Sequence, residues 1–463
     1  MGTRYHSYVC LLLLSIIVNQ LAARASADDA RPNLLLILVD DLGYGDLGSY
    51  GAEDLDSPHI DKLVKQGMKW TQFYANCPVC SPTRAALLSG QYPDAVGVPG
   101  VIRTHAQHSF GYLCPDVELL PAVLARARYR TAMIGKWHLG LGSPNLPNQR
   151  GFHFFHGFLG DMMNDYYNHL RHGFNYMRLN GDEIHPPEVH ATDLFTQWAC
   201  DWLKAYDSDS PFFMYVAYNA PHSPIQPPQE HLDRYHARHP DVGDQRAGLA
   251  AFVEHLDAGV GAVLAALDET GHTDNTLVIF TSDNGGAGYF GADNGPLAGQ
   301  KQDMLEGGIR IPMCARWPGK IAAGTANDRV ALTMDLFPTL CHAAGAEWSE
   351  DIDGRSILPT LLGESQPPEE RFLFWVRLEG GKRYQGKRYY CVRQGPWKLL
   401  QNDASEPLRL VHLENDPQEV TDLIDSNRPV TERLRRALEE HKAACASVPF
   451  RDEHGRGPNE VVE

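Results

Sequence analysis

Seven polar residues follow four apolar stretches of this 463-residue chain, and their side chains suit metal and anion binding. They are Asp40, Asp41, Lys136, His138, His222, Asp283 and Asn284. Three carboxylates and an amide are the oxygen ligands that a hard divalent cation, Ca²⁺ or Mg²⁺, prefers. Lysine and histidine beside such a cation would hold a tetrahedral oxyanion, and Arg84 and Lys301 are further candidates for this role.

The four apolar stretches are expected to be strands that bring these side chains together. Residues 32–46, 130–140, 211–222 and 275–286 are each apolar at successive positions, which is typical of strands buried on both faces of a parallel sheet. In open α/β sheets, ligands bind outside the carboxyl ends of the strands. The polar residues are therefore predicted to converge on one site.

Helical patterns lie between these strands. They cover residues 58–66, 82–89, 116–128, 192–206 and 249–270, and Gly271 ends the last apolar face. Alternating strands and helices predict an α/β fold with a large, mixed, mostly parallel sheet sandwiched by helices. After about residue 345 the pattern changes to short strands and a final helix near 431–446, which predicts a smaller C-terminal α+β subdomain with a short antiparallel sheet.

Each of these polar motifs also has a purely structural interpretation. Two aspartates after a strand often cap a helix, SDNGG is a turn sequence, and a single histidine near a strand end is more often packed than catalytic. The joint placement of the residues at strand ends is what favours a functional site.

Cys77 and Cys80 form a CxxC pair with three possible interpretations: a redox pair, half of a metal site, or something else. The chain has no second CxxC, which argues against a four-cysteine zinc site. A redox pair should open a helix with its first cysteine. Here the helix follows Cys80, in the sequence CSPTRAALLSG.

The N-terminus predicts export. A basic start, an apolar run from Val9 to Val18 and the small residues Ala25-Ser26-Ala27 are typical of a signal peptide cleaved near Ala27. We expect a periplasmic or secreted protein in which no later segment is apolar enough to span a membrane. The net charge is −17, and −17 − 2 = −19 without Arg4 and Arg24, which argues against nucleic-acid binding. Cysteine pairing cannot be predicted from one chain.

The motif C-x-P-x-R at Cys80 is the signal for oxidation of a cysteine to formylglycine (3-oxoalanine), and with it the chain resembles the type I, formylglycine-dependent sulfatases of the alkaline phosphatase-like superfamily. The resemblance covers nearly the whole length after the N-terminus. The motifs VDDLGYGD, CSPTRAALLSG, GKWHLG, NAPHSP, FTSDNGG and KQDMLEGGIRIP follow in family order.

The resemblance implies a role for each matching position. Asp40, Asp41, Cys80, Asp283 and Asn284 match the residues that bind one Ca²⁺. Arg84 matches the residue that holds the hydrated aldehyde, Lys136 and Lys301 match sulfate-gripping lysines, His138 matches the partner of the formylglycine hydroxyl, and His222 matches a sulfate contact. The implied mechanism is covalent, with His222 or Lys301 protonating the leaving alkoxide and His138 acting as base when sulfate is expelled.

Some positions depart from the family pattern. Thr83 replaces a commoner serine, and Ala298 stands where relatives often carry arginine, which leaves one substrate contact in doubt. His153 and His156 stand in a stretch that often shows Asp and Tyr, and are expected either to tune a sugar pocket or to pack.

The resemblance implies a hydrolase of sulfate monoesters, matured by a formylglycine-generating enzyme. An insertion rich in histidine and aromatic residues, around Asn164, Tyr166, His169, Arg171 and His172, favours a sulfated saccharide as substrate. A phosphate or phosphonate ester hydrolase of the same superfamily, or a non-catalytic binder of sulfated glycan if Cys80 is unmodified, are the alternatives. The expected divisions are a signal peptide at 1–27, a catalytic domain at 28–345 and a C-terminal subdomain at 346–463.

Overall fold

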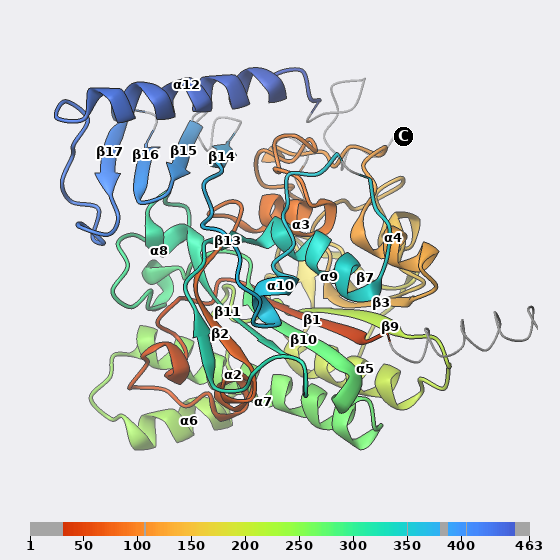
Figure 1. Cartoon of the computed structure of the whole chain (residues 1–463). Helices are drawn as coiled ribbons and strands as arrows, with labels where there is room; N and C mark the ends of the chain where they lie inside the picture. The colour runs from red at the N-terminus through yellow and green to blue at the C-terminus, as the bar shows by residue number, and fades with distance from the viewer. Residues whose placement is uncertain (1–30, 106–107, 350, 380–387, 404, 450–463) are drawn as a thin grey trace, which may run out of the picture.

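An eleven-stranded mixed sheet forms the centre of the molecule in the computed structural model, which describes residues 31–105, 108–349, 351–379, 388–403 and 405–449 (Figure 1). In spatial order the strands are β12 (Thr325–Asn327), β2 (Met68–Tyr74), β11 (Arg310–Arg316), β10 (Thr276–Ser282), β1 (Asn33–Val39), β9 (Phe212–Ala217), β3 (Arg130–Lys136), β4 (Phe154–Phe158), β7 (Met177–Leu179) and β8 (Asp182–Glu183), while β13 (Ala331–Leu332) pairs with β2. The expected signal peptide lies outside the described residues.

The middle of the sheet is parallel. Strands β10, β1, β9, β3 and β4 pair in one direction, whereas β11, β7 and β8 join through antiparallel pairs. The four strands predicted from the sequence are all present, and they are neighbours in the order β10-β1-β9-β3. This confirms the predicted fold class, including the mixed, mostly parallel sheet.

Helices cover both faces of the sheet, as the uninterrupted apolar strands predict. Along β1, Leu34, Leu36 and Leu38 point into one core and Leu35, Ile37 and Val39 into the other. The first core is closed by α3 (Cys80–Ser89), α4 (Leu120–Arg126), α9 (Leu336–Ala344) and α10 (Leu358–Leu361). The second is closed by α2 (Pro58–Lys65), α5 (Ala191–Lys204), α6 (Gln229–Arg238) and α7 (Asp244–Glu269), which lie together below the sheet in Figure 1.

The remaining short elements are α8 (Glu306–Ile309), the hairpin of β5 (Leu170–Arg171) and β6 (Phe174–Asn175), and 3₁₀ turns at Gly48–Tyr50, Pro147–Arg150, Thr273–Asn275, Gly288–Phe290 and Thr333–Asp335. A tight turn at Asn180-Gly181 joins β7 to β8, and Asn180 adopts the left-handed φ of 53°.

The helix bounds differ from the sequence-based prediction at their ends. Helix α3 begins at Cys80 itself rather than at residue 82, and α7 begins at Asp244 rather than at 249. Helix α7 is also long and apolar enough, by length and composition, to meet the criterion for a membrane span, so the expectation that no segment would do so was wrong. Because 67% of its apolar window is buried inside the fold, α7 serves here as a core helix.

A four-stranded antiparallel sheet forms the C-terminal part, with the order β14 (Leu373–Leu378), β15 (Arg388–Gln394), β16 (Trp397–Gln401) and β17 (Arg409–His412). One face packs on the main body through Trp375 and Tyr74, and the other is covered by α12 (Arg428–Cys445) through Leu434 and Leu438, as Figure 1 shows. The boundary at residue 345 stays a prediction. The eight described cysteines are all free thiols.

A buried ion network fastens this second sheet to the main body. Lys398 of β16 is fully buried, and its Nζ lies 3.0 Å from Glu306 Oε1 and 2.8 Å from Glu419 Oε1. Burial alone would raise the pKa of Glu306, but the charge of Lys398, followed by those of Arg393 and Arg310, lowers it to about 2. A depressed carboxyl pKa stabilises the fold above the unfolded value of 4.5, and this contribution is lost as the pH falls toward 2.

We therefore expect Lys398→Met to lower the free energy of unfolding by about 3–5 kcal/mol, because it removes the buried cation that Glu306 and Glu419 share. The variant should also lose less stability than the wild type between pH 5 and pH 2, since the pKa of Glu306 is no longer depressed by Lys398. Denaturant midpoints across this pH range measure both effects, with Lys204→Met, at an exposed position of α5, as the control. Equal midpoints for the two variants would contradict the role of the network.

Candidate active site

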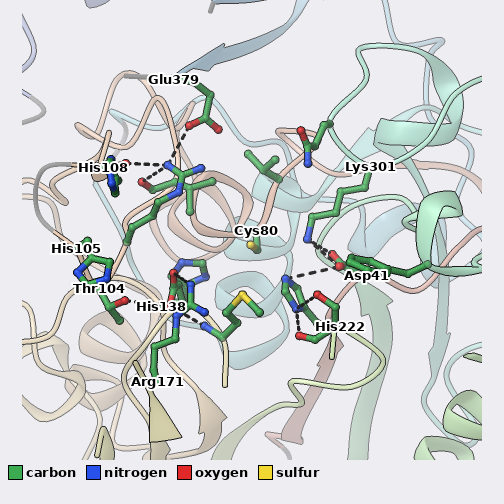
Figure 2. A pocket seen from close by; sticks show the side chains of 18 of the residues that line it. Asp41, Cys80, Thr104, His105, His108, His138, Arg171, His222, Lys301 and Glu379 are labelled. Carbon is green, nitrogen blue, oxygen red and sulfur yellow. Dashed lines mark hydrogen bonds and ion pairs between the residues drawn. The ribbon is translucent and has the colours of Figure 1, made fainter. Parts of the chain in front are cut away.

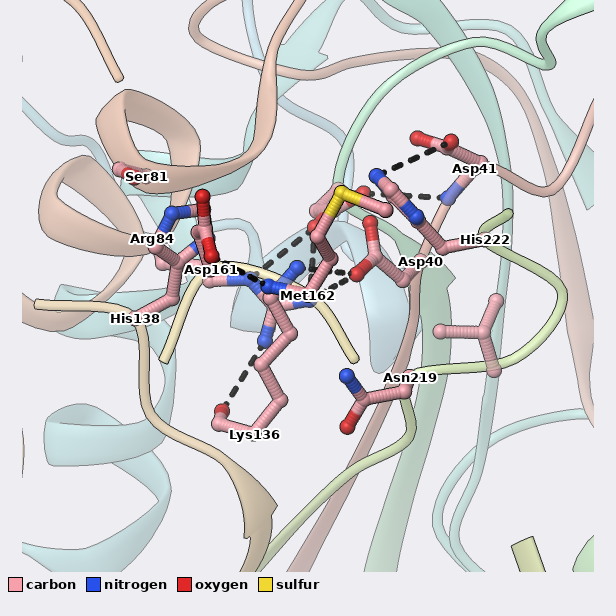
Figure 3. A network of polar contacts seen from close by, with 12 residues as sticks. Asp40, Asp41, Ser81, Arg84, Lys136, His138, Asp161, Met162, Asn219 and His222 are labelled. Carbon is pink, nitrogen blue, oxygen red and sulfur yellow. Dashed lines mark hydrogen bonds and ion pairs between the residues drawn. The ribbon is translucent and has the colours of Figure 1, made fainter. Parts of the chain in front are cut away.

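The carboxyl ends of the four central strands meet at one edge of the sheet, as predicted. Residues 40 and 41 follow β1, residues 283 and 284 follow β10, Lys136 ends β3 and His222 follows β9. A ligand-type atom of Asp40 lies within 4.8 Å of such atoms of both Asp283 and Cys80, and another set joins Asp40, Asp41 and His222. The structure thus brings the sequence-predicted residues into one cluster. Figure 3 shows part of it, with Asp40, Asp41, Lys136, His138 and His222.

Cys80 reaches this cluster because it is the first residue of α3. It is 5% exposed and lies at the floor of the pocket in Figure 2. Burial raises the pKa of its thiol to about 11, with Lys136 and Lys301 acting against the shift and Asp40 and Asp283 adding to it. The unmodified cysteine is therefore a neutral thiol at physiological pH, which is a poor nucleophile.

Cys77 lies apart from this chemistry. It is fully buried, and its Sγ lies 3.5 Å from the backbone oxygen of Val376. It forms no disulfide, so it is a packed neighbour of Cys80 rather than a partner.

The three carboxylates crowd one another and depend on neighbouring cations. Burial alone would raise the pKa of Asp40, but Lys136 and then His222, Arg84 and Lys301 hold it well below its usual range. Lys136 Nζ lies 2.5 Å from Asp40 Oδ2.

Asp283 shows the opposite shift. Burial, and then the charge of Asp40, raise its pKa to about 7, although the Arg84 guanidinium donates to its Oδ2 from Nε at 3.0 Å and from Nη2 at 2.7 Å. A further positive charge would relieve this repulsion between carboxylates.

Two buried oxygen atoms fit a metal ion at this point. Asp40 Oδ1 and Asn284 Oδ1 are both buried and have no hydrogen-bond partner, which is costly for an atom that remains uncoordinated. Asp41 accepts from Asn284 Nδ2 at 2.8 Å and pairs with Lys301 Nζ at 2.5 Å. The donor set is made of oxygens, which is the set that a hard divalent cation takes.

The two candidate histidines have defined tautomers. His138 Nε2 lies 2.7 Å from the Ile102 carbonyl, which can only accept, so Nε2 carries the proton. Its Nδ1 is then a lone pair, and it is buried without a partner. Burial, followed by Lys136 and Arg84, holds the pKa of His138 well below its usual range, so the ring is neutral.

His222 is arranged in the opposite sense. Its Nδ1 donates to the Ser223 carbonyl at 2.7 Å, and its Nε2 lies 3.7 Å from Asp41 Oδ2. Burial, and then Lys301, lower its pKa. The Tyr166 hydroxyl contacts the carbonyl oxygens of Asn219 and His222 at 2.8 Å each and so positions this segment.

The site has two layers. Of the predicted residues, five line a cavity of about 290 Å³: Asp41, Cys80, His138, His222 and Lys301. The other five, Asp40, Arg84, Lys136, Asp283 and Asn284, are fully buried behind them. Lys136 thus contacts Asp40 in this structure rather than the cavity, whereas Lys301 lies on the cavity wall (Figure 2).

The predicted sugar-contacting insertion reaches the cavity only in part. Arg171 and His172 line it, whereas His169 is buried with Nε2 against the Val189 carbonyl, and Asn164 accepts from the His172 backbone. His156 stacks on Trp198 with ring centroids 3.4 Å apart, and His153 contacts Thr131, so both are packing residues.

The sequence analysis missed much of the cavity wall. The wall also contains Arg103, Thr104, His105, His108, Asp161, Tyr289, Phe290, Arg377 and Glu379. Most of them lie in irregular segments or in the C-terminal sheet, where no spacing pattern in the sequence marks them. Their polar character was the one available signal.

The comparisons with known proteins agree with this geometry. A sulfatase family model matches residues 32–346, and a model of the C-terminal region of N-sulphoglucosamine sulphohydrolase matches residues 299–444. Human N-acetylgalactosamine-6-sulfatase is 34% identical over 73% of this chain and 67% of its own length, and human arylsulfatase A is 32% identical over 91% and 89%. The crystal structure of Ps i-CgsB in complex with k-i-k-neocarrahexaose superposes with a TM-score of 0.82 at 31% identity, covering 92% of this chain and 96% of the other.

Fold, site and relatives together define a sulfuric ester hydrolase. The chain belongs to the sulfatase family of the alkaline phosphatase-like superfamily.

The cluster of carboxylates yields a prediction about metal binding. Asp40→Asn keeps the shape of the side chain but removes one negative charge, so we expect divalent-cation affinity to fall roughly 10–100-fold or more. Equilibrium dialysis with metal analysis measures the loss, and circular dichroism checks that the fold is retained. Asp201→Asn, at an exposed position of α5, should bind the cation as the wild type does. Unchanged affinity in Asp40→Asn would show that the cluster is not a metal site.

Proposed function

We propose that this sulfatase is exported and hydrolyses sulfate monoesters on a sulfated carbohydrate, with Cys80 converted to formylglycine and one Ca²⁺ held at the carboxylate cluster. The observation that carries the proposal is the position of Cys80. It opens into the cavity, its Sγ and one carboxylate oxygen each of Asp40 and Asp283 lie within 4.8 Å of one another, and Asp40 Oδ1 beside it is buried without a partner. The motif CSPTR around it is the maturation signal on which a formylglycine-generating enzyme would act.

The residues proposed to hold the cation are Asp40, Asp41, Asp283 and Asn284, with residue 80 facing them. Bound there, Ca²⁺ would offset the carboxylate charge and favour an ionised hydroxyl nearby. If Cys80 is converted to formylglycine, the hydrated aldehyde would offer one hydroxyl for attack on sulfur and a second for the release of sulfate.

The protein's own groups would bind and move protons around that reaction. Lys301, on the cavity wall, can donate to a sulfate oxygen, while behind it Lys136 keeps Asp40 ionised and Arg84 pairs with Asp283. The free Nδ1 lone pair of His138 can accept a proton at residue 80. The acid that protonates the leaving oxygen is either Lys301 or His222. His222 is neutral, with its proton on Nδ1, so it could donate from Nε2 only after taking up a second proton.

The proposed function is tested by the ratio of aryl sulfate to aryl phosphate turnover, together with the state of residue 80. We expect sulfate turnover to dominate and Cys80→Ser to lose at least 10³-fold in kcat, because the serine ester lacks the second hydroxyl. In mass spectra the tryptic peptide 70–84 of active protein should have a lower mass than the unmodified peptide, because conversion of cysteine to formylglycine removes the elements of H₂S and adds one oxygen atom.

Other outcomes would overturn the proposal. Dominant phosphate turnover would instead assign a phosphate or phosphonate ester hydrolase. An unmodified Cys80 with saccharide binding but no turnover would assign a non-catalytic glycan binder. Export is tested separately by sequencing the mature N-terminus, which we expect near residue 28.

A saccharide substrate is supported by the outer wall of the cavity. Arg171 forms a two-point pair with Asp161, with Nε–Oδ1 at 2.9 Å and Nη2–Oδ2 at 3.1 Å, and the rings of His105 and His172 stack 4.3 Å apart. Oriented guanidinium, carboxylate and imidazole groups suit the hydroxyls of a sugar ring. The similar structure of Ps i-CgsB is described with a bound neocarrahexaose.

We expect Arg171→Gln to lower the ratio of kcat/KM for a sulfated saccharide to that for an aryl sulfate by roughly 10-fold or more, as for loss of a charged hydrogen bond. The aryl group is too small to use the outer wall fully, so it serves as the internal reference. Arg178→Gln, on neighbouring β7 and outside the cavity lining, is the matched control. An unchanged ratio in Arg171→Gln would exclude this wall from saccharide binding.

A further inference from the structure

A second cluster of metal-ligating side chains lies away from the active site, where α12 meets the loop that follows α3. It consists of Asp94 from that loop and of His441 and Cys445 from the last two turns of α12. His441 Nε2 lies 2.9 Å from Asp94 Oδ2 and 4.0 Å from Cys445 Sγ. One ligand atom from each residue lies within 4.8 Å of the other two.

The arrangement brings together three different donor atoms. His441 and Cys445 are four residues apart on a helix and therefore point from the same face. Asp94 comes from nearly 350 positions earlier in the chain and is 8% exposed. The side chain of His441 is 9% exposed, and Cys445 is half-buried.

One carboxylate oxygen of Asp94 is available to coordinate a metal ion. Its Oδ1 is buried and has no hydrogen-bond partner, although Oδ2 contacts His441. The His441 ring is held in place by stacking on Phe374, with centroids 4.3 Å apart and planes at 7°, and by an edge contact with Tyr92 at 4.9 Å. A ring fixed in this way keeps Nε2 directed at the cluster without further ordering cost.

We propose that Asp94, His441 and Cys445 form a zinc-binding site that fastens the C-terminal helix to the main body. Oxygen, imidazole nitrogen and thiolate sulfur are together a donor set for zinc, whereas the four residues proposed to hold Ca²⁺, Asp40, Asp41, Asp283 and Asn284, offer oxygen atoms. Tetrahedral zinc with bonds of 2.0–2.3 Å separates its ligand atoms by about 3.3–3.7 Å. The separations of 2.9 and 4.0 Å reach these values after shifts of a few tenths of an ångström.

The residues around the proposed zinc site leave room for a fourth ligand, and their charges are compatible with a bound zinc ion. A cavity of about 240 Å³ borders Asp94 and Cys445, so water can complete the coordination. Lys442 and Arg388 also line this cavity, but Lys442 Nζ pairs with Glu439 at 2.8 Å. Zinc with one carboxylate and one thiolate is neutral overall.

Zinc binding would release the thiol proton of Cys445. Without a metal, burial, and then the charge of Asp94, raise the pKa of this thiol to about 12. A bound zinc ion reverses that preference, because the coordinated sulfur is the thiolate, and the proton passes to solvent.

The site connects α12 to the loop that leads into the active-site wall. Asp94 lies a few residues beyond the end of α3, which carries Cys80, and Val101 and Arg103 of the wall follow it. Gly97 of this loop closely approaches the C-terminal segment, since a Cβ there would lie 2.7 Å from the Pro449 carbonyl oxygen. Zinc would therefore add metal–ligand bonds to a junction at which His441 Nε2 already lies 2.9 Å from Asp94 Oδ2.

The test is zinc binding by full-length protein that has been stripped by chelator and then equilibrated with Zn²⁺ in excess Ca²⁺, so that the oxygen site is filled. We expect about one zinc per chain in the wild type and in Cys80→Ser, and a marked loss in Cys445→Ser and His441→Ala. Zinc should raise the Tm of the wild type but not of Cys445→Ser. Cys114→Ser, another half-buried cysteine, is the matched control and should retain the zinc.

A spectroscopic readout makes the assignment specific. Co²⁺ in place of zinc should give a thiolate charge-transfer band that persists in Cys80→Ser and disappears in Cys445→Ser. Two results would overturn the proposal and leave His441 and Asp94 as an ion pair. One is an equal zinc content in Cys445→Ser and the wild type, and the other is that the wild type binds no zinc when Ca²⁺ is present in excess. Because aryl sulfate turnover is measured on the same variants, this failure is distinguishable from failure of the proposed function.

Discussion

The structure depends on burying three carboxylates and three cations together at the carboxyl edge of the central strands. None of Asp40, Asp41 and Asp283 is more than 3% exposed, and each lies against Lys136, Lys301 or Arg84. Removing such charges from water is costly unless each has a partner. The backbone is constrained for this purpose as well, since Asp41 has a φ of 70° and His138 a φ of 59°, conformations that non-glycine residues adopt rarely.

The buried layer and the cavity layer of the site have different roles. In the buried layer, Arg84 and Lys136 are paired with Asp283 and Asp40 and so determine the charge of those carboxyl groups. The cavity layer meets substrate, and there Lys301 shares its charge with Asp41. Asp41 is the residue whose partner would change when a cation and a sulfate arrive, since both Lys301 and His222 Nε2 lie against it. The two lysines that the family resemblance treats alike are therefore physically different in this chain.

The inner layer could be predicted from the sequence because its residues follow apolar runs that mark buried strands. Apolar runs such as that of β1 mark the buried strands, and the polar residues follow at their ends. Strands β2 and β11 were not predicted, since their burial depends on pairing with elements far away in the chain, and β11 contains Pro312. The outer wall was missed for a similar reason. Arg103, Arg377 and Glu379 come from a loop and from the end of β14, and nothing local in the sequence links them.

The C-terminal sheet thus contributes to the cavity as well as to stability. Arg377 and Arg103 both pair with Glu379, and Arg377 also donates to the Gln302 carbonyl at 2.9 Å, so the second sheet supplies part of the cavity wall. Its position is fixed by buried contacts elsewhere, with Lys398 against Glu306 and Trp375 donating to the Ala75 carbonyl. Changes at the end of β14 that move Arg377 or Glu379 are expected to reshape the outer wall, because the inner charges are held by other pairs, Lys136 with Asp40 and Arg84 with Asp283. The residues of the outer wall and those of the buried charged cluster are thus held by different parts of the chain, so one can change without the other.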